Sequence, residues 1–94
     1  MKVRVWAEVH PTEAEEKVRR AVSNLFPTLQ LSVSEDRISG ESTEVSALER
    51  FRRLLRAHQI LDTARSVMWS AREGDTTRFM LNKQAAYVGK VSFT

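Results

Sequence analysis

The sequence predicts an α+β fold in which helices pack on one face of a mostly antiparallel sheet. Short segments with alternating apolar and polar residues are interleaved with segments whose apolar residues recur at helical spacing. Their order is β-α-β-β-α(α)-β-α-β. No linker, repeat or low-complexity segment divides the 94 residues. We therefore expect one domain over residues 1–94.

The N-terminal strand and helix follow from their residue patterns. Apolar and polar residues alternate strictly over residues 2–9, which predicts a half-buried strand with Trp6 on its polar side. Thr12 and Glu15 have the spacing of a capping box, so we expect a helix to begin there. The helix ends before Pro27, because proline disfavours helical geometry in the residue that precedes it.

A β-hairpin is expected next. Apolar residues alternate again over residues 29–33, residues 34–36 form a turn, and residues 37–41 form a short strand. Ile38 is expected to point inward from this strand.

The longest helical pattern begins after Ser46, which repeats the capping-box spacing with Glu49. Apolar residues recur at helical spacing on both sides of His58. The pattern leaves open whether they form one long helix with a break or two helices. Gly74 then predicts the end of the helix and a turn.

The last part of the chain predicts a strand, a short helix and a final strand. Residues 76–81 and residues 90–93 both alternate. Asn82 is expected to cap the short helix, which runs through Val88 and stops at Gly89.

The composition excludes several classes of protein. The chain has no cysteine, which rules out a disulfide scaffold, a thiolate zinc site, an iron–sulfur cluster and a catalytic cysteine. No apolar run approaches the roughly 18 residues of a membrane span. No apolar segment follows the basic start, as it would in a secretory signal. We therefore expect a cytoplasmic protein without a membrane partner.

Few residues suggest a metal site or catalysis. The two histidines, His10 and His58, have no cluster of further ligands beside them in the sequence, so no metal is expected. Glu13, Glu15 and Glu16 fall in the first turn of a helix, where negative charge is favourable. No nucleophile has a base beside it, so we expect no enzyme and no cofactor. An enzyme with a pocket between sheet and helices is kept as a third class of hypothesis.

The net charge of +3 conceals an asymmetry. Residues 1–49 carry six Lys/Arg against nine Asp/Glu, whereas residues 50–94 carry nine against three, a net +6. Four arginines cluster in one predicted helix: Arg50, Arg52, Arg53 and Arg56. Such a cluster predicts contacts with nucleic-acid phosphates. The alternative is an ordinary solvated helix face.

Two further cations are candidates for the same role. Arg65 is three residues after Asp62, and this pair is either a structural ion pair or one in which Asp62 orients Arg65 toward a ligand. Lys83 lies at the start of the last helix beside Asn82, where an anion is favoured. The alternative is an ordinary capped helix with polar ends.

Trp6 is the one aromatic residue expected on the open sheet face, since Phe79 and Phe93 are expected to point inward. Base stacking normally uses two or three aromatic residues on adjacent strands. A surface that a second subunit covers therefore explains an exposed Trp6 at least as well as a base-stacking surface does.

Three segments together resemble one protein family. They are Asn24-Leu25-Phe26-Pro27, the run from Ile60 to Val67, and the run from Leu81 to Phe93. They are similar to an archaeal family of small uncharacterised proteins labelled "RNA-binding protein", over nearly the whole chain. The resemblance implies RNA binding and a fold like that of the large-subunit ribosomal protein that binds 5S rRNA. Members are usually longer, which implies a C-terminal segment that this chain lacks.

We therefore expect a non-catalytic RNA-binding domain that contacts the phosphates of structured RNA. The expected contacts are Arg52, Arg53, Arg56, Arg65 and Lys83. The alternative is a homodimeric protein-interaction module with no nucleic-acid role. The placement of the acids discriminates between the two, because interspersed carboxylates would weaken a basic surface. The glutamates concerned are Glu13, Glu16, Glu41 and Glu49.

Overall fold

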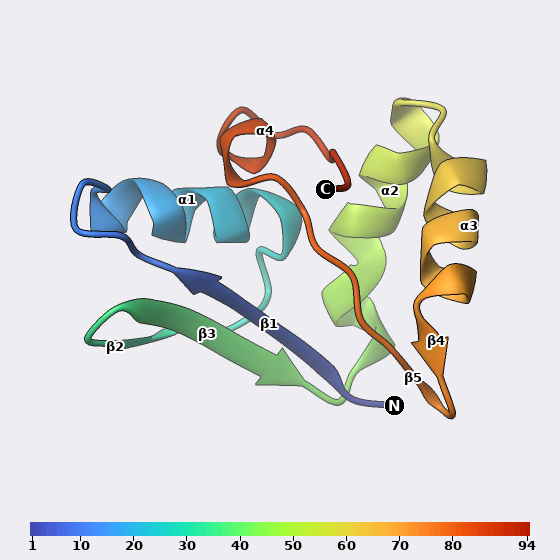
Figure 1. The fold of residues 1–94 in the computed structure, drawn as a ribbon, viewed down its shortest axis with the longest axis horizontal. Helices are drawn as coiled ribbons and strands as arrows, with labels where there is room; N and C mark the ends of the chain where they lie inside the picture. The colour runs from blue at the N-terminus through green and yellow to red at the C-terminus, as the bar shows by residue number, and fades with distance from the viewer.

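A three-stranded antiparallel sheet forms one side of the molecule (Figure 1). The computed structural model describes residues 1–94. The strands are β1 (Val3–Glu8), β2 (Ser32–Ser34) and β3 (Arg37–Ser42), with β3 in the centre. Ile38 on β3 is fully buried and pairs with Ala7 on β1 and Val33 on β2. The predicted hairpin is present, although its first strand covers Ser32–Ser34 and not the expected residues 29–33, and the inward position of Ile38 is confirmed.

One of the four α-helices, α1, packs against this sheet, and the other three pack against α1 or against one another (Figure 1). They are α1 (Glu15–Leu25), α2 (Glu49–Ala57), α3 (Leu61–Ser70) and α4 (Lys83–Tyr87), and a 3₁₀ helix, η1 (Val45–Leu48), leads into α2. α1 lies along the sheet with α4 beside it, and α2 and α3 stand side by side. The chain turns between α2 and α3 at Gln59, whose φ is +56°. The pattern around His58 is therefore two helices, and the predicted α+β class is confirmed.

The strand expected over residues 76–81 is shorter than predicted and does not join the main sheet. Only β5 (Thr76–Thr77) pairs, with β4 (Arg72–Glu73), in a separate antiparallel hairpin. Gly74 has a φ of +61° in the connecting turn, a conformation that glycine adopts without steric cost. A short local loop closes at little entropic cost, which favours this hairpin over a distant strand partner.

The final strand expected over residues 90–93 is reduced to a single bridge, in which Phe93 pairs with Leu81. The short helix before it agrees with the prediction. The Asn82 side chain accepts the backbone N–H three residues later at 2.9 Å, and Gly89 ends the segment with a φ of +77°.

The capping box predicted at Thr12 and Glu15 is wrong. α1 begins at Glu15 without a side-chain cap, because the preceding residues form a turn of their own. In this turn the His10 N–H donates to the Glu13 carboxylate at 3.0 Å, and the Glu13 N–H donates to the His10 carbonyl at 2.8 Å.

The capping box predicted at Ser46 and Glu49 is also wrong. The chain enters α2 through η1, and no side chain caps either element. The Ser46 hydroxyl instead donates to the Glu44 carboxylate at 3.3 Å.

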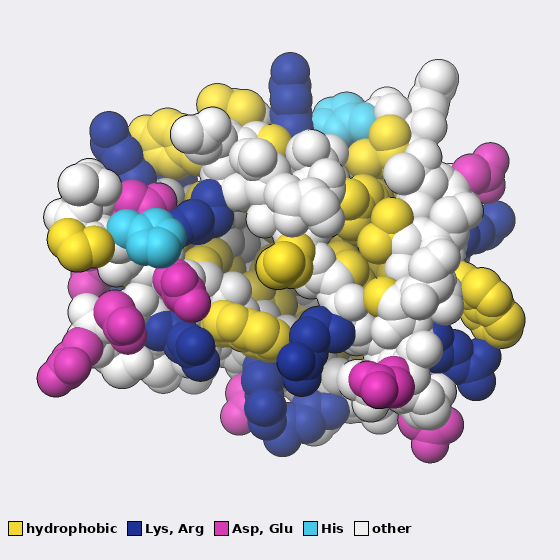
Figure 2. Space-filling model, viewed as in Figure 1, with side chains coloured by type: hydrophobic (Ala, Val, Ile, Leu, Met, Phe, Trp, Pro, Cys, Tyr) yellow, Lys and Arg dark blue, Asp and Glu magenta, His cyan; other side chains and the backbone are white.

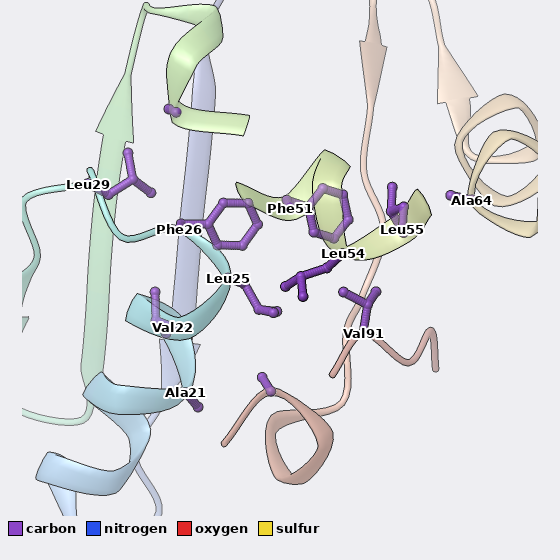
Figure 3. Packing of buried hydrophobic residues seen from close by; sticks show 12 residues of the cluster. Ala21, Val22, Leu25, Phe26, Leu29, Phe51, Leu54, Leu55, Ala64 and Val91 are labelled. Atoms are coloured by element: carbon purple, nitrogen blue, oxygen red, sulfur yellow. The ribbon is translucent and has the colours of Figure 1, made fainter. Parts of the chain in front are cut away.

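The hydrophobic core lies where α1, α2 and the C-terminal segment meet (Figure 3). The Phe26 and Phe51 rings stack with their centroids 5.4 Å apart, and Phe51 stacks in turn on Phe79 at 6.0 Å. Leu25 and Leu54 fill the space between α1 and α2 beside these rings. The apolar face of α2 is thus fixed against α1, and the polar face of α2 points outward.

Asn24 joins α1 to the C-terminal end of α4. Its amide donates to the Ala86 carbonyl at 2.9 Å and to the Tyr87 carbonyl at 3.0 Å. These carbonyls belong to the last turn of α4, where the Ala86 carbonyl also accepts the Gly89 N–H at 3.0 Å. Asn24 therefore adds two hydrogen bonds that hold the end of α4 against α1.

We expect Asn24→Ala to lower the free energy of unfolding by about 1–3 kcal/mol, because the two hydrogen bonds between α1 and α4 are lost. Urea denaturation followed by circular dichroism measures the change. Ser23→Ala, at the neighbouring position on α1, is the control. Equal stability of the two variants would contradict this role of Asn24.

Candidate nucleic-acid interface

The polar face of α2 carries four exposed arginines, namely Arg50, Arg52, Arg53 and Arg56. The helix turns this face outward because Phe51, Leu54 and Leu55 are buried on the opposite side. No exposed aromatic residue lies among the arginines on α2. The helix therefore presents guanidinium groups alone, which bind phosphate and carboxylate oxygens in a planar, bidentate manner.

Only one of these arginines has a carboxylate partner. Arg53 pairs with Glu49 one turn earlier at 2.6 Å, and both side chains are well exposed. An exposed pair of this type contributes about 0.3–0.5 kcal/mol, so a phosphate can compete for Arg53 at little cost. Arg50, Arg52 and Arg56 make no ion pair within the chain.

The spacing of Arg52 and Arg56 is unfavourable for the helix alone. Like charges four residues apart lie next to each other and destabilise a helix by about 0.2–0.5 kcal/mol. The position of Arg56 stabilises the helix in part, because a cation in the last helical turn interacts favourably with the helix dipole. Arg52 lies too early in the helix for this interaction. An anionic partner would relieve the repulsion that this pair imposes on the folded chain.

The acids are mostly placed away from this face. Glu13 pairs with Lys83, and Glu41 pairs with Lys2 at 3.2 Å and with Arg4 at 3.5 Å. Of the four glutamates that discriminate between the hypotheses, Glu49 alone is in α2, and Glu16 lies on α1 without an ion pair. The α2 arginines therefore outnumber the carboxylates around them.

The outer surface of the sheet differs, because it carries both signs of charge. Lys2 and Arg4 share the Glu41 carboxylate there, and hydrogen bonding to Lys2 holds the pKa of Glu41 below its ordinary value. Over the sheet, in the lower left of Figure 2, acidic and basic side chains are interspersed. This surface has the mixed potential that disfavours RNA binding.

The structure places the other two predicted contacts on other helices than α2. Arg65 lies on α3, where it is 3.8 Å from Asp62 and lines a hollow with Trp69 and Arg72. Lys83 lies at the start of α4, where its ammonium group is 2.7 Å from the Glu13 carboxylate. The five predicted residues therefore come from three helices, α2, α3 and α4.

Lys83 is occupied by contacts within the chain. Its Nζ donates to the Glu8 carbonyl at 2.8 Å as well as to Glu13, which ties α4 to the end of β1. The hydrogen bond from Lys83, helped by the backbone N–H of His10, holds the pKa of Glu13 below its ordinary value. A phosphate at Lys83 would therefore have to displace these contacts.

This pKa shift predicts a dependence of stability on pH. A carboxylate whose folded pKa is lowered stabilises the fold above its unfolded pKa, about 4.3 for glutamate, and loses this contribution as the pH falls through the folded value. Glu13→Gln should therefore lose less stability than the wild type when the pH drops from about 5 to about 3. Denaturant unfolding at several pH values measures this, with Glu16→Gln as the control. An unchanged pH profile in Glu13→Gln would contradict the assignment.

A hollow between α1, α2 and α4 brings Arg20 of α1 close to Arg50 of α2. Its volume is about 400 Å³, and its lining residues are Arg20, Asn24, Arg50, Tyr87, Val88 and Gly89. Arg20 lies over the Tyr87 ring, 5.8 Å from its centroid. No carboxylate lines the hollow. It is thus a concave site with two guanidinium groups and suits a phosphate at the edge of the α2 surface.

Sequence reasoning did not single out Arg20 and Tyr87. Arg20 and Arg50 are 30 positions apart, and only the packing of α1 against α2 and α4 brings them together. One signal was available, since Arg20 is four residues before Asn24 and therefore shares its helix face. Asn24 also belongs to the segments that carry the family resemblance.

Other kinds of site find little support in the geometry. No group of three or more metal-binding side chains comes together. His10 contacts Glu13 at 4.0 Å and has no further ligand beside it. None of the helices has both the length and the apolar run needed to cross a membrane.

Comparison with known proteins agrees with a nucleic-acid-binding class. A family model described as RNA binding matches residues 2–94. The chain therefore belongs to this RNA-binding family. The expected likeness in fold to the ribosomal protein that binds 5S rRNA stays a prediction.

The relatives carry the name UPF0201 protein. One from Metallosphaera sedula is 45% identical over 92 residues, which cover 95% of this chain and 64% of the relative. One from Thermococcus onnurineus is 43% identical over 96 residues, covering 97% of this chain and 70% of the relative. The crystal structure of the UPF0201 protein from Methanococcus jannaschii has a TM-score of 0.92 at 37% identity, and covers all of this chain and 86% of that one. The chain thus spans less than two thirds of the Metallosphaera relative's length.

Proposed function

We propose that this domain binds structured RNA without catalysis, through phosphate contacts made by the arginine surface of α2. This surface consists of Arg50, Arg52, Arg53 and Arg56, with Arg20 at its edge. The observation that carries the proposal is the adjacent pair Arg52 and Arg56, which have no carboxylate partner. The family's description as RNA binding supports the same function.

The chemistry of the surface favours the RNA backbone over the bases. Each cation that neutralises a phosphate releases a condensed counterion, which gives affinity without sequence preference. α2 exposes no aromatic side chain on which a base could stack. Double-stranded RNA is recognised mostly by its shape and its phosphates, which matches a helix that offers guanidinium groups only.

Filter binding of a labelled RNA hairpin tests the proposal directly. We expect a dissociation constant in the micromolar range or tighter at low salt. With three to four phosphate contacts, log K should fall against log salt with a slope of about −3. No binding at low salt would contradict the proposal. Binding that is independent of salt would exclude phosphate contacts as its source.

The second hypothesis, a homodimeric interaction module, stays a prediction. Trp6 is 42% exposed and Met80 is 67% exposed, so both offer apolar surface to a partner. Static light scattering at high protein concentration tests it, and a strict monomer would count against it.

A further inference from the structure

We propose that the groove between α3 and the β4–β5 hairpin binds unpaired RNA nucleotides, with Trp69 as the platform on which a base stacks. The proposal rests on the RNA-binding function proposed above, and it assigns the unpaired part of the ligand to a site away from α2. The observation behind it is an exposed indole between two arginines in an open hollow of about 810 Å³.

Trp69 is unusually exposed for a tryptophan. Its exposed fraction is 72%, because it lies outside the apolar stripe by which α3 packs, where Ala64 is buried. The Arg72 guanidinium lies over the ring, 5.0 Å from its centroid. The high exposure leaves much of the indole open to a base, and every base has a π-face that stacks on an aromatic ring.

Arg72 is held in a fixed position beside the indole. Its Nε donates to the Gly74 carbonyl at 3.0 Å within the hairpin turn. The Thr77 hydroxyl donates to the Met68 carbonyl at 2.7 Å, which joins β5 to α3. The arginine and the ring are therefore arranged before any ligand arrives, and less conformational entropy is lost on binding.

The charges along the groove suit a phosphodiester backbone. Arg65 and Arg72 line it, against one carboxylate, Asp75. Arg65 is 3.8 Å from Asp62, but Asp62 is fully exposed, so this pair is weak and can exchange for a phosphate. At the right edge of Figure 2, next to α3 and β4, a hydrophobic side chain projects beside Lys or Arg side chains.

Trp6 has a similar arginine neighbour and yet is a poorer candidate. The Arg78 guanidinium is 5.7 Å from its ring centroid. However, Trp6 is only 42% exposed, and the basic residues nearest along its strand are neutralised by Glu41. The two tryptophans therefore form a matched pair for experiment, with one in a basic groove and one on a surface of mixed charge.

Tryptophan fluorescence separates the two sites, because each single substitution leaves one reporter. We expect a short oligouridylate to quench the fluorescence of Trp6→Phe, in which Trp69 remains. The fluorescence of Trp69→Phe, in which Trp6 remains, should be unchanged. In filter binding, Trp69→Ala should weaken binding of the oligouridylate by about tenfold, as expected for one lost base–aromatic stack, and leave binding of a blunt-ended RNA duplex, which has no unpaired nucleotide, unaffected. Trp6→Ala is the affinity control, and melting curves verify that both variants fold.

The outcomes distinguish this proposal from the function on which it rests. Suppose that the hairpin binds, but the oligouridylate does not quench the fluorescence of Trp69 and binds Trp69→Ala as tightly as the wild type. The groove assignment then fails, and the α2 surface stands. If the oligouridylate quenches Trp6 instead, the stacking site is on the sheet and the assignment is again overturned. If neither RNA binds at low salt, both proposals fall.

Discussion

Replacement of Phe51 by alanine is expected to lower the free energy of unfolding by about 3–5 kcal/mol, the usual cost of removing a buried phenylalanine. Phe51 is 2% exposed and lies in the middle of a row of rings. It stacks on Phe26 at 5.4 Å and on Phe79 at 6.0 Å, and Phe79 contacts Phe93 at 5.8 Å. The row joins α1 and α2 to the C-terminal segment, so no neighbouring side chain can collapse into the space without moving one of these elements.

Urea denaturation of Phe51→Ala measures this loss against the wild type. Domains of this size have about 5–15 kcal/mol of stability in total, so the variant should be largely unfolded if the wild type lies near the lower limit. Phe51→Leu should lose less, because it keeps most of the buried volume. Val88→Ala is the exposed control. A loss below about 1 kcal/mol in Phe51→Ala would contradict the packing described here.

The second large effect is expected in RNA binding. Replacing Arg50, Arg52 and Arg56 together by glutamine should weaken binding of the RNA hairpin by about 100-fold or more at about 0.1 M salt. Each phosphate contact that is lost releases one counterion fewer, which lowers the binding constant about eightfold at this salt concentration. The same variant should be as stable as the wild type or slightly more stable, since it removes repulsion between like charges.

A control with the same change in net charge is available in the chain. Lys17, Arg37 and Lys90 are exposed, make no ion pair and lie outside α2. Replacing these three by glutamine should weaken binding of the RNA hairpin only slightly. Equal losses in the two triple variants would show that net charge, and not the α2 surface, governs binding.

The elements that the sequence predicted well are those whose pattern depends on one face alone. β1 and β3 alternate because one side of each strand is buried, and Ile38 lies where the alternation places it. The starts of α1 and α2 were predicted less well. A capping box is a local spacing, and at Thr12 a competing local turn between His10 and Glu13 takes the place that the cap would have. A sequence pattern cannot rank two local hydrogen-bonding schemes of similar strength.

The pairing of strands depends on tertiary contacts that the pattern does not contain. Residues 76–81 alternate as a sheet strand would, yet Thr76–Thr77 pair with the residues just before the turn. The same limit applies to the site. The arginines of α2 were found because one helix carries them, whereas Arg20 reaches Arg50 only through the packing of α1 and α4. Charge clusters within one element are readable from sequence, and clusters between elements are not.

The most direct test of the central claim is the salt dependence of hairpin binding by the wild type and by the triple variant of Arg50, Arg52 and Arg56. The wild type should give a slope of log K against log salt of about −3. The triple variant should give a slope between about −1 and zero, since about one unit is lost for each phosphate contact removed and Arg53 remains. Parallel slopes in the two proteins would contradict the claim that RNA phosphates bind the arginine surface of α2.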